Sequence, residues 1–311
     1  MKAILLNDFG GVENLILSNI NTPIIADNDV LIQVKAISVN PIDVKTRSGK
    51  GMAATLKTQN PMILGWDISG VVTASRSTLF AVGDDVFGMV NFPGIGKAYA
   101  EYVAAPASHL ALKPVTISHV EAAAASLAAL TAWQAIVTHA NVQAGQRVLI
   151  HAASGGVGHF AVQIAKALGA YVIGTSSAAN RDFVLSLGAD EHIDYKAQTL
   201  SEATHAIDFV LDAIGNETID HSLSVMKPGA TIISIPSGKN EAVKEKAEAK
   251  GMIGYPIRVH SNGSDMQQLA DLLEKGQIKA HVSQTFAFDE MQQAHRQIES
   301  GRTQGKLVVL V

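Results

Sequence analysis

The alternation of apolar and polar positions divides the chain into two parts with different rhythms. In the first 120 residues, short β-branched segments such as 30–36, 68–72 and 86–90 are separated by Gly, Pro and Asn. Many short strands with turn residues between them are typical of a compact, barrel-like β domain. We therefore predict such a domain over residues 1–121.

From about residue 121 the pattern becomes strand, helix, strand, helix. Apolar strands are predicted at residues 147–152, 171–175, 207–213 and 230–235, and helices at 160–168 and 181–187. This alternation predicts a parallel sheet with helices on both faces over residues 122–262. The region opens with an Ala-rich segment, residues 122–137, which we predict as a buried helix.

The remaining segment, residues 263–311, contains both kinds of element. We predict a helix at 264–275, a strand at 285–288, a helix that Asp289 caps and that ends at 300, and a strand at 306–311. An apolar strand at a chain end leaves backbone groups unpaired unless it joins a sheet. We therefore expect this segment to return to the first domain and complete it.

Composition narrows the classes of protein that this pattern allows. The chain has 311 residues, of which 47% are hydrophobic and 17% charged, so it can bury a sizeable core and is not globally disordered. Lys and Arg total 24 against 28 for Asp and Glu, and this acidic balance argues against a nucleic-acid partner. The longest apolar stretch is too short and too polar to span a membrane.

The chain contains no cysteine. This excludes disulfides, thiolate nucleophiles and Cys-ligated zinc or iron–sulfur centres. The N-terminus also lacks the apolar segment of a secretory signal. We therefore expect a protein of the reducing cytoplasm.

The sharpest local motif is the glycine-rich segment HAASGGVG at residues 151–158, between a predicted strand and a predicted helix. Glycines there let the backbone turn tightly and approach a diphosphate, and the first amides of the helix face the anion. The motif departs from G-x-G-x-x-G, and a structural turn of any α/β protein is the alternative. We predict that it binds a dinucleotide. The residues assigned to the diphosphate are Ser154, Gly155, Gly156, Val157 and Gly158.

The end of the next strand bears on which dinucleotide binds. An acidic residue here would bond the ribose hydroxyls of NAD, but residues 175–181 read TSSAANR, without a carboxylate. Ser176 and Arg181 offer donors to a 2′-phosphate, and Tyr195 adds a phenolic hydroxyl. Alone, Arg181 would be interpreted as a solvated helix residue. Together with the missing acid, these donors favour NADPH over NADH.

Several motifs together resemble a known family. They are the segment 152–158, NPID at 40–43, GWDISG at 65–70, GDDV at 83–86 and LTA at 130–132. The chain resembles the medium-chain dehydrogenase/reductase superfamily over essentially its whole length. More narrowly, it resembles the zinc-independent quinone oxidoreductases, the zeta-crystallin-like branch.

The resemblance implies an α/β enzyme of two domains. A GroES-like β-barrel catalytic domain, residues 1–121, would be completed by residues 263–311. A Rossmann domain with a doubly wound parallel sheet would cover residues 122–262, with the active-site cleft between the domains. Zinc-dependent relatives carry a Cys in the segment that matches Ser38–Asp43 and a His-Glu pair where this chain has Trp66-Asp67. This chain has no Cys at all, so we expect no catalytic metal. The family also implies a homodimer joined through edge strands.

The resemblance places candidate catalytic residues in the segment after residue 38. Asn40 and Asp43 would lie at the cleft floor, Asn40 donating its amide to a carbonyl and Asp43 orienting a neighbour or a proton-carrying water. Lys45 stands where many members have Tyr, and it is either an electrostatic stabiliser or a solvated lysine. We interpret the segment as a strand that runs into a turn.

Further candidates follow from the same resemblance. Trp66 would wall the substrate pocket, although a core position is favoured for so large an aromatic side chain. Thr131 would face the nicotinamide, or else bond its own helix backbone. His151 is expected to be a satisfied core histidine.

More cofactor contacts are expected where strands of the second domain end. Open α/β sheets bind ligands at the carboxyl ends of their strands. Asp212 and Ile214 follow one such strand, although Asp212 could instead be a cap. Ile235 and Ser237 end the next strand and resemble the stretch that meets the carboxamide.

The leading hypothesis is an NADPH-dependent quinone oxidoreductase that works by metal-independent hydride transfer. Without a Lewis acid, the easier acceptors delocalise the incoming charge themselves, as quinones and α,β-unsaturated carbonyls do. An alkenal or enone reductase, acting on a carbon–carbon double bond, is therefore an alternative that the motifs leave open. A non-enzymatic NADPH-binding structural or RNA-associated protein is an alternative of another class.

Overall fold

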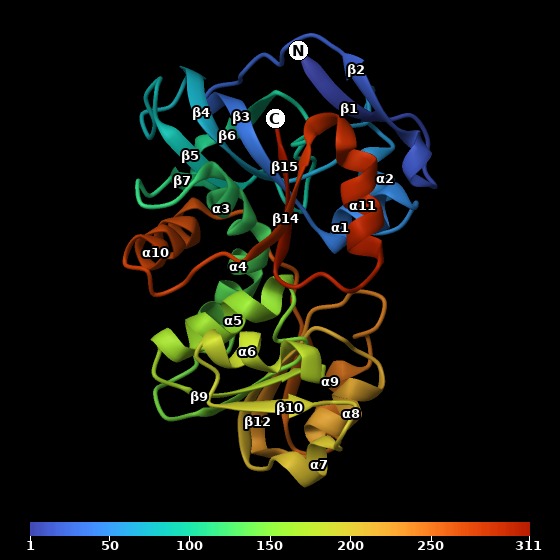
Figure 1. The fold of residues 1–311 in the computed structure, drawn as a ribbon, viewed down its shortest axis with the longest axis vertical. Helices are drawn as coiled ribbons and strands as arrows, with labels where there is room; N and C mark the ends of the chain where they lie inside the picture. Colours follow the sequence, from blue (N-terminus) through green and yellow to red (C-terminus); the bar gives the residue numbers. More distant parts are fainter. The chain divides into compact units, whose positions relative to one another are not determined.

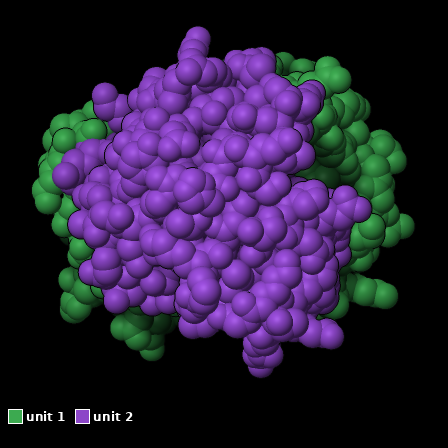
Figure 2. Space-filling model, turned by 90° about the horizontal axis from the view of Figure 1, so that it is seen from below, with its two compact units in different colours: residues 1–130, 259–276, 280–311 green, residues 131–258, 277–279 purple.

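The computed structural model describes all 311 residues, in two compact units. Unit 1 comprises Met1–Leu130, Val259–Gly276 and Ala280–Val311, and unit 2 comprises Thr131–Arg258 and Gln277–Lys279 (Figures 1 and 2). No helix combines the length and the apolar character that crossing a membrane requires. We expected the first division at 121/122, whereas unit 1 extends to residue 130 because the helix after residue 118 packs on its strands.

Unit 1 is built mainly of antiparallel strands, in a two-stranded and a seven-stranded sheet. The strands are β1 (Lys2–Leu6), β2 (Leu15–Asn19), β3 (Asp29–Val39), β4 (Asp67–Ser75), β5 (Asp85–Met89), β6 (Tyr102–Pro106), β7 (Leu110–Leu112), β14 (Val282–Ala287) and β15 (Lys306–Leu310). The larger sheet runs β14-β15-β3-β4-β5-β7, and β6 also pairs with β3. The β-rich first domain predicted from the sequence is confirmed.

The end of the chain joins this sheet. β15 pairs antiparallel with β3, Leu307 opposite Val39, and β14 lies parallel to β15. Apolar side chains of β15 lie in the same buried cluster as those of β3. The predicted return of the C-terminal segment to the first domain is therefore confirmed.

The helices of unit 1 are short, apart from the two C-terminal ones. They are α1 (Pro41–Arg47), α2 (Ala53–Leu56), α3 (His119–Ala124), α10 (Gly263–Glu274), α11 (Met291–Glu299) and the 3-10 turns η1 (Val12–Asn14), η2 (Ala107–His109) and η5 (Phe288–Glu290). The prediction that Asp289 caps the last helix is wrong. Asp289 lies inside η5, and α11 begins after Glu290, whose carboxylate accepts the backbone N–H of Ala287.

The segment after β3 is a helix and not the strand-to-turn segment that we expected. Asn40 is the N-cap of α1 and Pro41 its first residue, a position where a missing N–H costs nothing. The Asp43 carboxylate accepts the backbone N–H of Asn40, as in a capping box. This local pairing starts a helix that periodicity does not reveal.

The Ala-rich segment is also broken where one helix was predicted. α3 ends at Ala124, α4 (Leu127–Trp133) begins after Ser126, and a π-helical stretch, η3 (Gln134–His139), follows. Most of the segment is buried, as expected. Its small side chains allow close packing: Ala123 and Ala124 lie in one apolar cluster with Ala36 and Val308.

Unit 2 contains a six-stranded sheet whose strands are all parallel. The strands are β8 (Arg147–Ile150), β9 (Tyr171–Ser176), β10 (Glu191–Asp194), β11 (Ile207–Asp212), β12 (Met226–Ser234) and β13 (Ile253–Pro256). The helices are α5 (Gly156–Ala167), η4 (Ala178–Asn180), α6 (Arg181–Ser186), α7 (Leu200–Ala203), α8 (Glu217–Leu223) and α9 (Val243–Glu248).

The strand order of this sheet identifies its ligand-binding edge. The order β10-β9-β8-β11-β12-β13 is the doubly wound 3-2-1-4-5-6 arrangement. The direction of winding reverses between β8 and β11, and ligands of such sheets bind outside the carboxyl ends of the strands at this point. The predicted Rossmann sheet is confirmed, and the glycine-rich turn follows β8 at its switch point.

The turn after β8 depends on two unusual backbone positions. Ala152 adopts a left-handed φ of 50°, which bends the chain at the end of β8. α5 then begins at Gly156, four residues before the predicted start. A Cβ placed on Gly158 would lie 2.1 Å from the carbonyl oxygen of Ala152, so the first turn of α5 lies directly against the turn before it. Only glycine fits at this contact.

We expect Gly158→Ala to destabilise the protein by about 1–3 kcal/mol, since the new methyl group meets backbone atoms that must move. Gly155→Ala is the matched control. Its Cβ would lie 3.2 Å from the same carbonyl, and its φ of −84° suits any residue. Urea unfolding of the two variants measures the difference. Equal stabilities would contradict the close contact at Gly158.

Candidate functional site

The amino end of α5 offers unpaired backbone donors. The first helical hydrogen bond runs from the N–H of His159 to the carbonyl of Gly155, so the amides of Gly156, Val157 and Gly158 have no partner within the helix. They lie at the positive end of a twelve-residue helix, which favours an anion. This cradle, which a side chain at Gly158 would disrupt, fits the diphosphate of a dinucleotide.

Asp212 shapes the neighbouring loop. Its buried carboxylate accepts the backbone N–H groups of Ile214 and Gly215 and the hydroxyl of Ser234. Asp212 thus caps the backbone N–H groups of the loop after β11, which was the alternative to a contact with the cofactor. It thereby positions that loop. Ile214, by contrast, is 45% exposed.

His151 is a satisfied core histidine, as predicted. Its Nδ1 lies 3.1 Å from the hydroxyl of Thr175 and its Nε2 2.9 Å from that of Ser222. Because the Ser222 hydroxyl donates to the carbonyl of Thr218, Nε2 of His151 is the donor in its contact with Ser222. Burial lowers the pKa of His151 to about 4, which keeps it uncharged at neutral pH.

The ends of β9 and β10 gather the donors that we predicted for a 2′-phosphate. Arg181 and Tyr195 are both 61% exposed, and the Arg181 side chain pairs only loosely with the exposed Asp182, at 3.6 Å. Ser176 is buried, and its hydroxyl contacts His192 Nε2 at 2.8 Å. Sequence analysis missed His192, because a contact between adjacent parallel strands depends on their register.

Two of the predicted catalytic residues, Asn40 and Asp43, lie in a buried polar cluster of unit 1. The cluster comprises Asn40, Asp43, Asp67 and Lys306. The Asn40 amide donates to Asp67 Oδ2 at 2.8 Å and to the carbonyl of Ser38 at 3.3 Å, while its oxygen accepts from the Lys306 ammonium. Both amide hydrogens are therefore used inside the protein. Asn40 therefore holds the cluster together, whereas we expected its amide to donate to a substrate carbonyl.

Asp67 also connects the cluster to the Ala-rich helices. Its Oδ1 accepts the backbone N–H of Leu127, the first residue of α4, at 2.9 Å. The carboxylate thereby satisfies one of the unpaired amides at a helix start. Burial raises the pKa of Asp67 to about 6, and the Lys306 ammonium opposes this rise.

Asp43 extends the cluster toward the C-terminal helix. Burial raises the pKa of its carboxyl to about 7, although the hydrogen bond from Asn40 opposes the change. Tyr99 acts on the same carboxyl, and its hydroxyl lies 2.9 Å from His295 Nε2. Since Arg47 donates to His295 Nδ1, the ring carries its proton on Nε2 and donates to Tyr99.

Arg47 links these hydrogen bonds of Tyr99 and His295 to the protein surface. Its guanidinium, only 4% exposed, pairs with Glu299 at the end of α11 and donates to the carbonyl of Gly10. Burial and the adjacent Arg47 charge lower the pKa of His295 to about 3. The contacts position α1 by holding it to α11.

Of the other three predicted catalytic residues, Trp66 and Thr131 are buried and Lys45 is half-buried. Trp66 is 2% exposed, packs edge-on against Phe92 and donates its indole N–H to the carbonyl of Gly94, so the favoured core position is confirmed. Thr131 is also buried, at 6% exposure. Lys45 is half-buried on α1.

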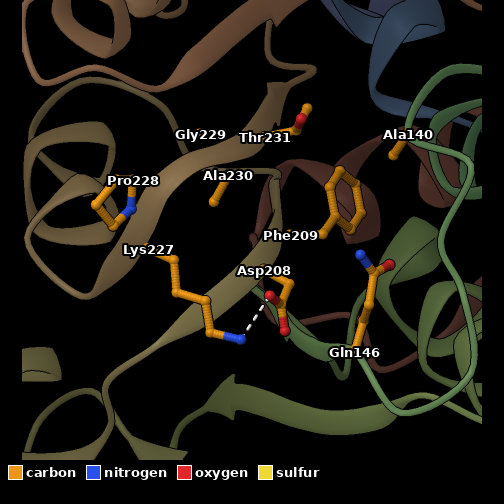
Figure 3. Close-up of a pocket in the computed structure, with 9 residues that line it drawn as sticks. All are labelled: Ala140, Gln146, Asp208, Phe209, Lys227, Pro228, Gly229, Ala230 and Thr231. Atoms are coloured by element: carbon orange, nitrogen blue, oxygen red, sulfur yellow. Dashed lines mark hydrogen bonds and ion pairs between the residues drawn. The ribbon is translucent and has the colours of Figure 1, made fainter.

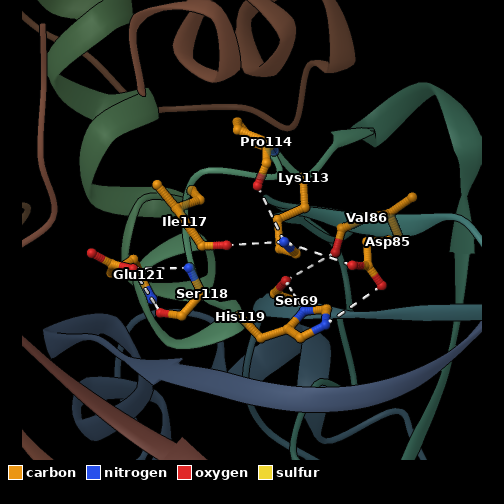
Figure 4. A network of polar contacts seen from close by, with 9 residues as sticks. All are labelled: Ser69, Asp85, Val86, Lys113, Pro114, Ile117, Ser118, His119 and Glu121. Carbon is orange, nitrogen blue, oxygen red and sulfur yellow. Dashed lines mark hydrogen bonds and ion pairs between the residues drawn. The ribbon is translucent and has the colours of Figure 1, made fainter. Parts of the chain in front are cut away.

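A serine, a histidine and an aspartate also meet in unit 1, but without access to a substrate. Ser69 Oγ lies 2.8 Å from His119 Nδ1, and His119 Nε2 lies 3.5 Å from Asp85 (Figure 4). Ser69 is fully buried and also bonds the carbonyl of Val86. The network therefore anchors the start of α3 to β4 and β5, and it is not a hydrolytic triad.

A hollow of about 200 Å³ in unit 2 lies away from the glycine-rich turn. It is lined by Gln146, by Asp208 and Phe209 of β11, and by residues of β12 that include Lys227, which pairs with Asp208 (Figure 3). These residues belong to the amino ends of their strands, whereas the turn follows the carboxyl end of β8. The hollow is not part of the dinucleotide site. Across all 311 residues, no three His, Asp or Glu side chains form a group that could hold a metal ion.

We expect Asp43→Asn to remove part of the pH dependence of stability. A carboxyl whose pKa is raised from 3.8 to about 7 by folding stabilises the protein below pH 4, and this contribution is lost as the pH rises through 7. Between pH 5 and 7, the free energy of unfolding should therefore fall more steeply in the parent than in Asp43→Asn. The difference in slope should be on the order of 1 kcal/mol per pH unit. Urea unfolding measures it, with the exposed Asp27→Asn as control. Parallel profiles for parent and Asp43→Asn would contradict the protonation of Asp43.

Comparisons with known proteins agree with this geometry. The family described as "Alcohol dehydrogenase GroES-like domain" matches residues 26–115, and the family described as "Zinc-binding dehydrogenase" matches residues 187–309. Among solved structures, the quinone oxidoreductase from Coxiella burnetii is 37% identical, with a TM-score of 0.94 over 100% of this chain and 99% of that one. The Escherichia coli quinone oxidoreductase complexed with NADPH is 28% identical, with a TM-score of 0.89 and full coverage of both chains.

Curated relatives cover the whole chain as well. The mitochondrial NAD(P)H oxidoreductase RTN4IP1 of Mus musculus is 33% identical over 100% of this chain and 89% of its own length. The chloroplastic NADPH-dependent alkenal/one oxidoreductase of Arabidopsis thaliana is 33% identical over 99% of this chain and 79% of its own length. The quinone oxidoreductase of Mus musculus is 31% identical over 100% of this chain and 98% of its own length. The chain therefore belongs to the medium-chain dehydrogenase/reductase superfamily, within its quinone oxidoreductase branch, and is an NAD(P)H-dependent oxidoreductase.

Proposed function

We propose that the protein reduces quinones with NADPH by hydride transfer. The observation that carries this proposal is the similarity of the entire chain, in sequence and in fold, to quinone oxidoreductases, one of them complexed with NADPH. The doubly wound sheet with its glycine-rich turn supports a dinucleotide cofactor.

The chain's own residues suit each part of that cofactor. We assign the diphosphate to the amides of residues 156–158 and the 2′-phosphate to the Arg181 guanidinium and the Tyr195 hydroxyl. The loop that Asp212 holds presents Ile214, and the stretch with Ile235 and Ser237 follows β12 at the same sheet edge. We assign Ile235 and Ser237 to the carboxamide and Thr131 to the nicotinamide face. A bound reduced nicotinamide supplies the hydride.

The buried polar cluster has a positioning role in this proposal. Asn40 and Asp43 are 1% and 0% exposed and hold the start of α1, and neither offers a free donor at the surface. Lys45, two residues further along the same helix, is half-buried and carries a cation. We assign to Lys45 the stabilisation of negative charge on the acceptor oxygen.

A second candidate function is reduction of alkenals or enones at the carbon–carbon double bond. The observation that favours it is the similarity, over 99% of this chain, to relatives named NADPH-dependent alkenal/one oxidoreductase and 2-methylene-furan-3-one reductase. Both acceptor classes place the arriving charge on a conjugated oxygen, so the same cofactor site serves either one. Nothing in the comparisons favours a non-enzymatic or RNA-associated role.

We also propose a homodimer and a cytoplasmic location. β13 is an edge strand of the unit 2 sheet, and Ile253 at its start is 53% exposed, so this edge is able to pair with a second copy. The location follows from the absence of cysteine, whereas some relatives are named mitochondrial or chloroplastic.

A substrate panel tests the function directly. We expect the protein to oxidise NADPH with simple quinones, at rates that EDTA leaves unchanged, because no group of metal ligands exists in the chain. Absorbance at 340 nm measures the rate. Turnover of enones alone would replace the first proposal with the second. Bound NADPH without turnover of either class would contradict both.

We expect Arg181→Ala to weaken NADPH binding about 10-fold to 100-fold, because a charged hydrogen bond to phosphate contributes about 1.5–3 kcal/mol. NADH lacks the 2′-phosphate, so its affinity should change by less than about twofold. Titration calorimetry measures both affinities. The control is Arg302→Ala, which removes an exposed arginine from unit 1. Equal weakening of NADPH and NADH would show that Arg181 does not bind the 2′-phosphate.

A further inference from the structure

His192 occupies an unassigned position beside the proposed 2′-phosphate donors. It lies on β10, where the parallel register places it opposite Gly174 and places Asp194 opposite Ser176. The imidazole reaches along the neighbouring strand, and its Nε2 lies 2.8 Å from the hydroxyl of Ser176. Ser176 is 4% exposed.

The Ser176 hydroxyl has one hydrogen and two neighbours that can accept it. It lies 3.1 Å from the carbonyl of Ser177 as well as 2.8 Å from His192 Nε2. If Nε2 carries no proton, it accepts the hydroxyl hydrogen. If the ring is doubly protonated, Nε2 donates to the oxygen, and the hydroxyl hydrogen is free to turn toward another acceptor. The Ser176 hydroxyl can donate to His192 only while the ring is neutral with its proton on Nδ1, so protonation of His192 removes this acceptor.

Charges around His192 favour the neutral ring while no phosphate is present. Burial and the neighbouring Arg181 guanidinium lower its pKa, and Asp194 on the same strand opposes them. Asp182 of α6 points to solvent beside Arg181, and Lys196 follows in the turn after β10. Glu191, the remaining charge on the strand, bonds Tyr171.

A 2′-phosphate changes this balance. It carries close to two negative charges at neutral pH and would lie against Arg181, the cation that disfavours a charged His192. Neutralising that cation and adding a nearby anion both favour the imidazolium. The imidazolium then donates to Ser176, whose hydroxyl hydrogen becomes available to a phosphate oxygen. NADH carries no such phosphate and would leave the ring neutral.

We propose that His192 is a specificity-determining residue that takes up a proton when a 2′-phosphorylated cofactor binds, so that the preference for NADPH over NADH increases as the pH falls from 8 toward 6.5. The inference rests on the proposed NADPH-dependent function. It adds a coupling between cofactor choice and pH, through the contact between His192 and Ser176.

Titration calorimetry in buffers of different ionisation enthalpy measures the proton uptake. For the parent protein at pH 7, we expect uptake of on the order of half a proton per NADPH and none per NADH. NADPH affinity should fall about threefold to tenfold from pH 6.5 to 8. Adenosine 2′,5′-bisphosphate, which lacks the nicotinamide, should show the same uptake and serves as a probe independent of catalysis.

His192→Gln removes the titrating ring and keeps an amide donor of similar reach. This variant should bind NADPH without proton uptake, and its NADPH affinity should not fall between pH 6.5 and 8. His205→Gln is the control, since His205 is an exposed histidine before β11, at the opposite ends of the strands. It should behave as the parent does.

Each outcome is decisive. Equal uptake with NADPH and NADH in the parent, or an unchanged pH profile in His192→Gln, would overturn the inference while leaving NADPH binding intact. Failure of the parent to bind NADPH would instead overturn the proposed function. If His192→Gln does not fold, the parent's difference in uptake between NADPH and NADH, together with the NMR titration of its histidine C–H resonances, decides the matter.

Discussion

The contact between Gly158 and the carbonyl of Ala152 is the constraint on which the cofactor site depends. A side chain at this position would push the first turn of α5 away from the end of β8. Because Gly158 has no side chain, α5 starts directly after the turn that follows β8. The amides of residues 156–158 then face the switch point of the sheet. The left-handed backbone at Ala152 and the loop held by Asp212 complete the same edge.

Unit 1 solves a different problem, which is how to bury charged groups in its interior. Asp67 and Lys306 are buried, and Asn40 lies between them, donating to one and accepting from the other. Isolated ions would be costly there, and hydrogen bonds to each charged group reduce that cost. The result fixes α1 and the start of α4 and leaves Lys45 as the half-buried cation of the segment.

The sequence predicts the repeating features of the fold well. Alternation of strands and helices identifies the parallel sheet, and the glycine-rich segment identifies the tight turn between β8 and α5, since both depend on neighbours in the chain. The apolar end of the chain likewise indicates that it joins the first domain. Local capping was harder to predict, because the α1 start uses Asn40 and Asp43 in place of the more familiar Ser or Thr with Glu.

Contacts between distant residues could not be predicted from one sequence. The interaction of Lys306 with Asn40 joins residues that are 266 positions apart, and it changes the role of Asn40 from a substrate donor to a buried link. The contact of His192 with Ser176 needs the register of two strands. Such pairings arise only when the sheets form.

The most direct measurement is a crystal structure of the protein grown with NADPH. The diphosphate should lie over the amino end of α5, against residues 154–158, with the 2′-phosphate within hydrogen-bonding distance of the Arg181 guanidinium. A diphosphate bound elsewhere on unit 2, or an adenosine end directed away from β9 and β10, would contradict the account.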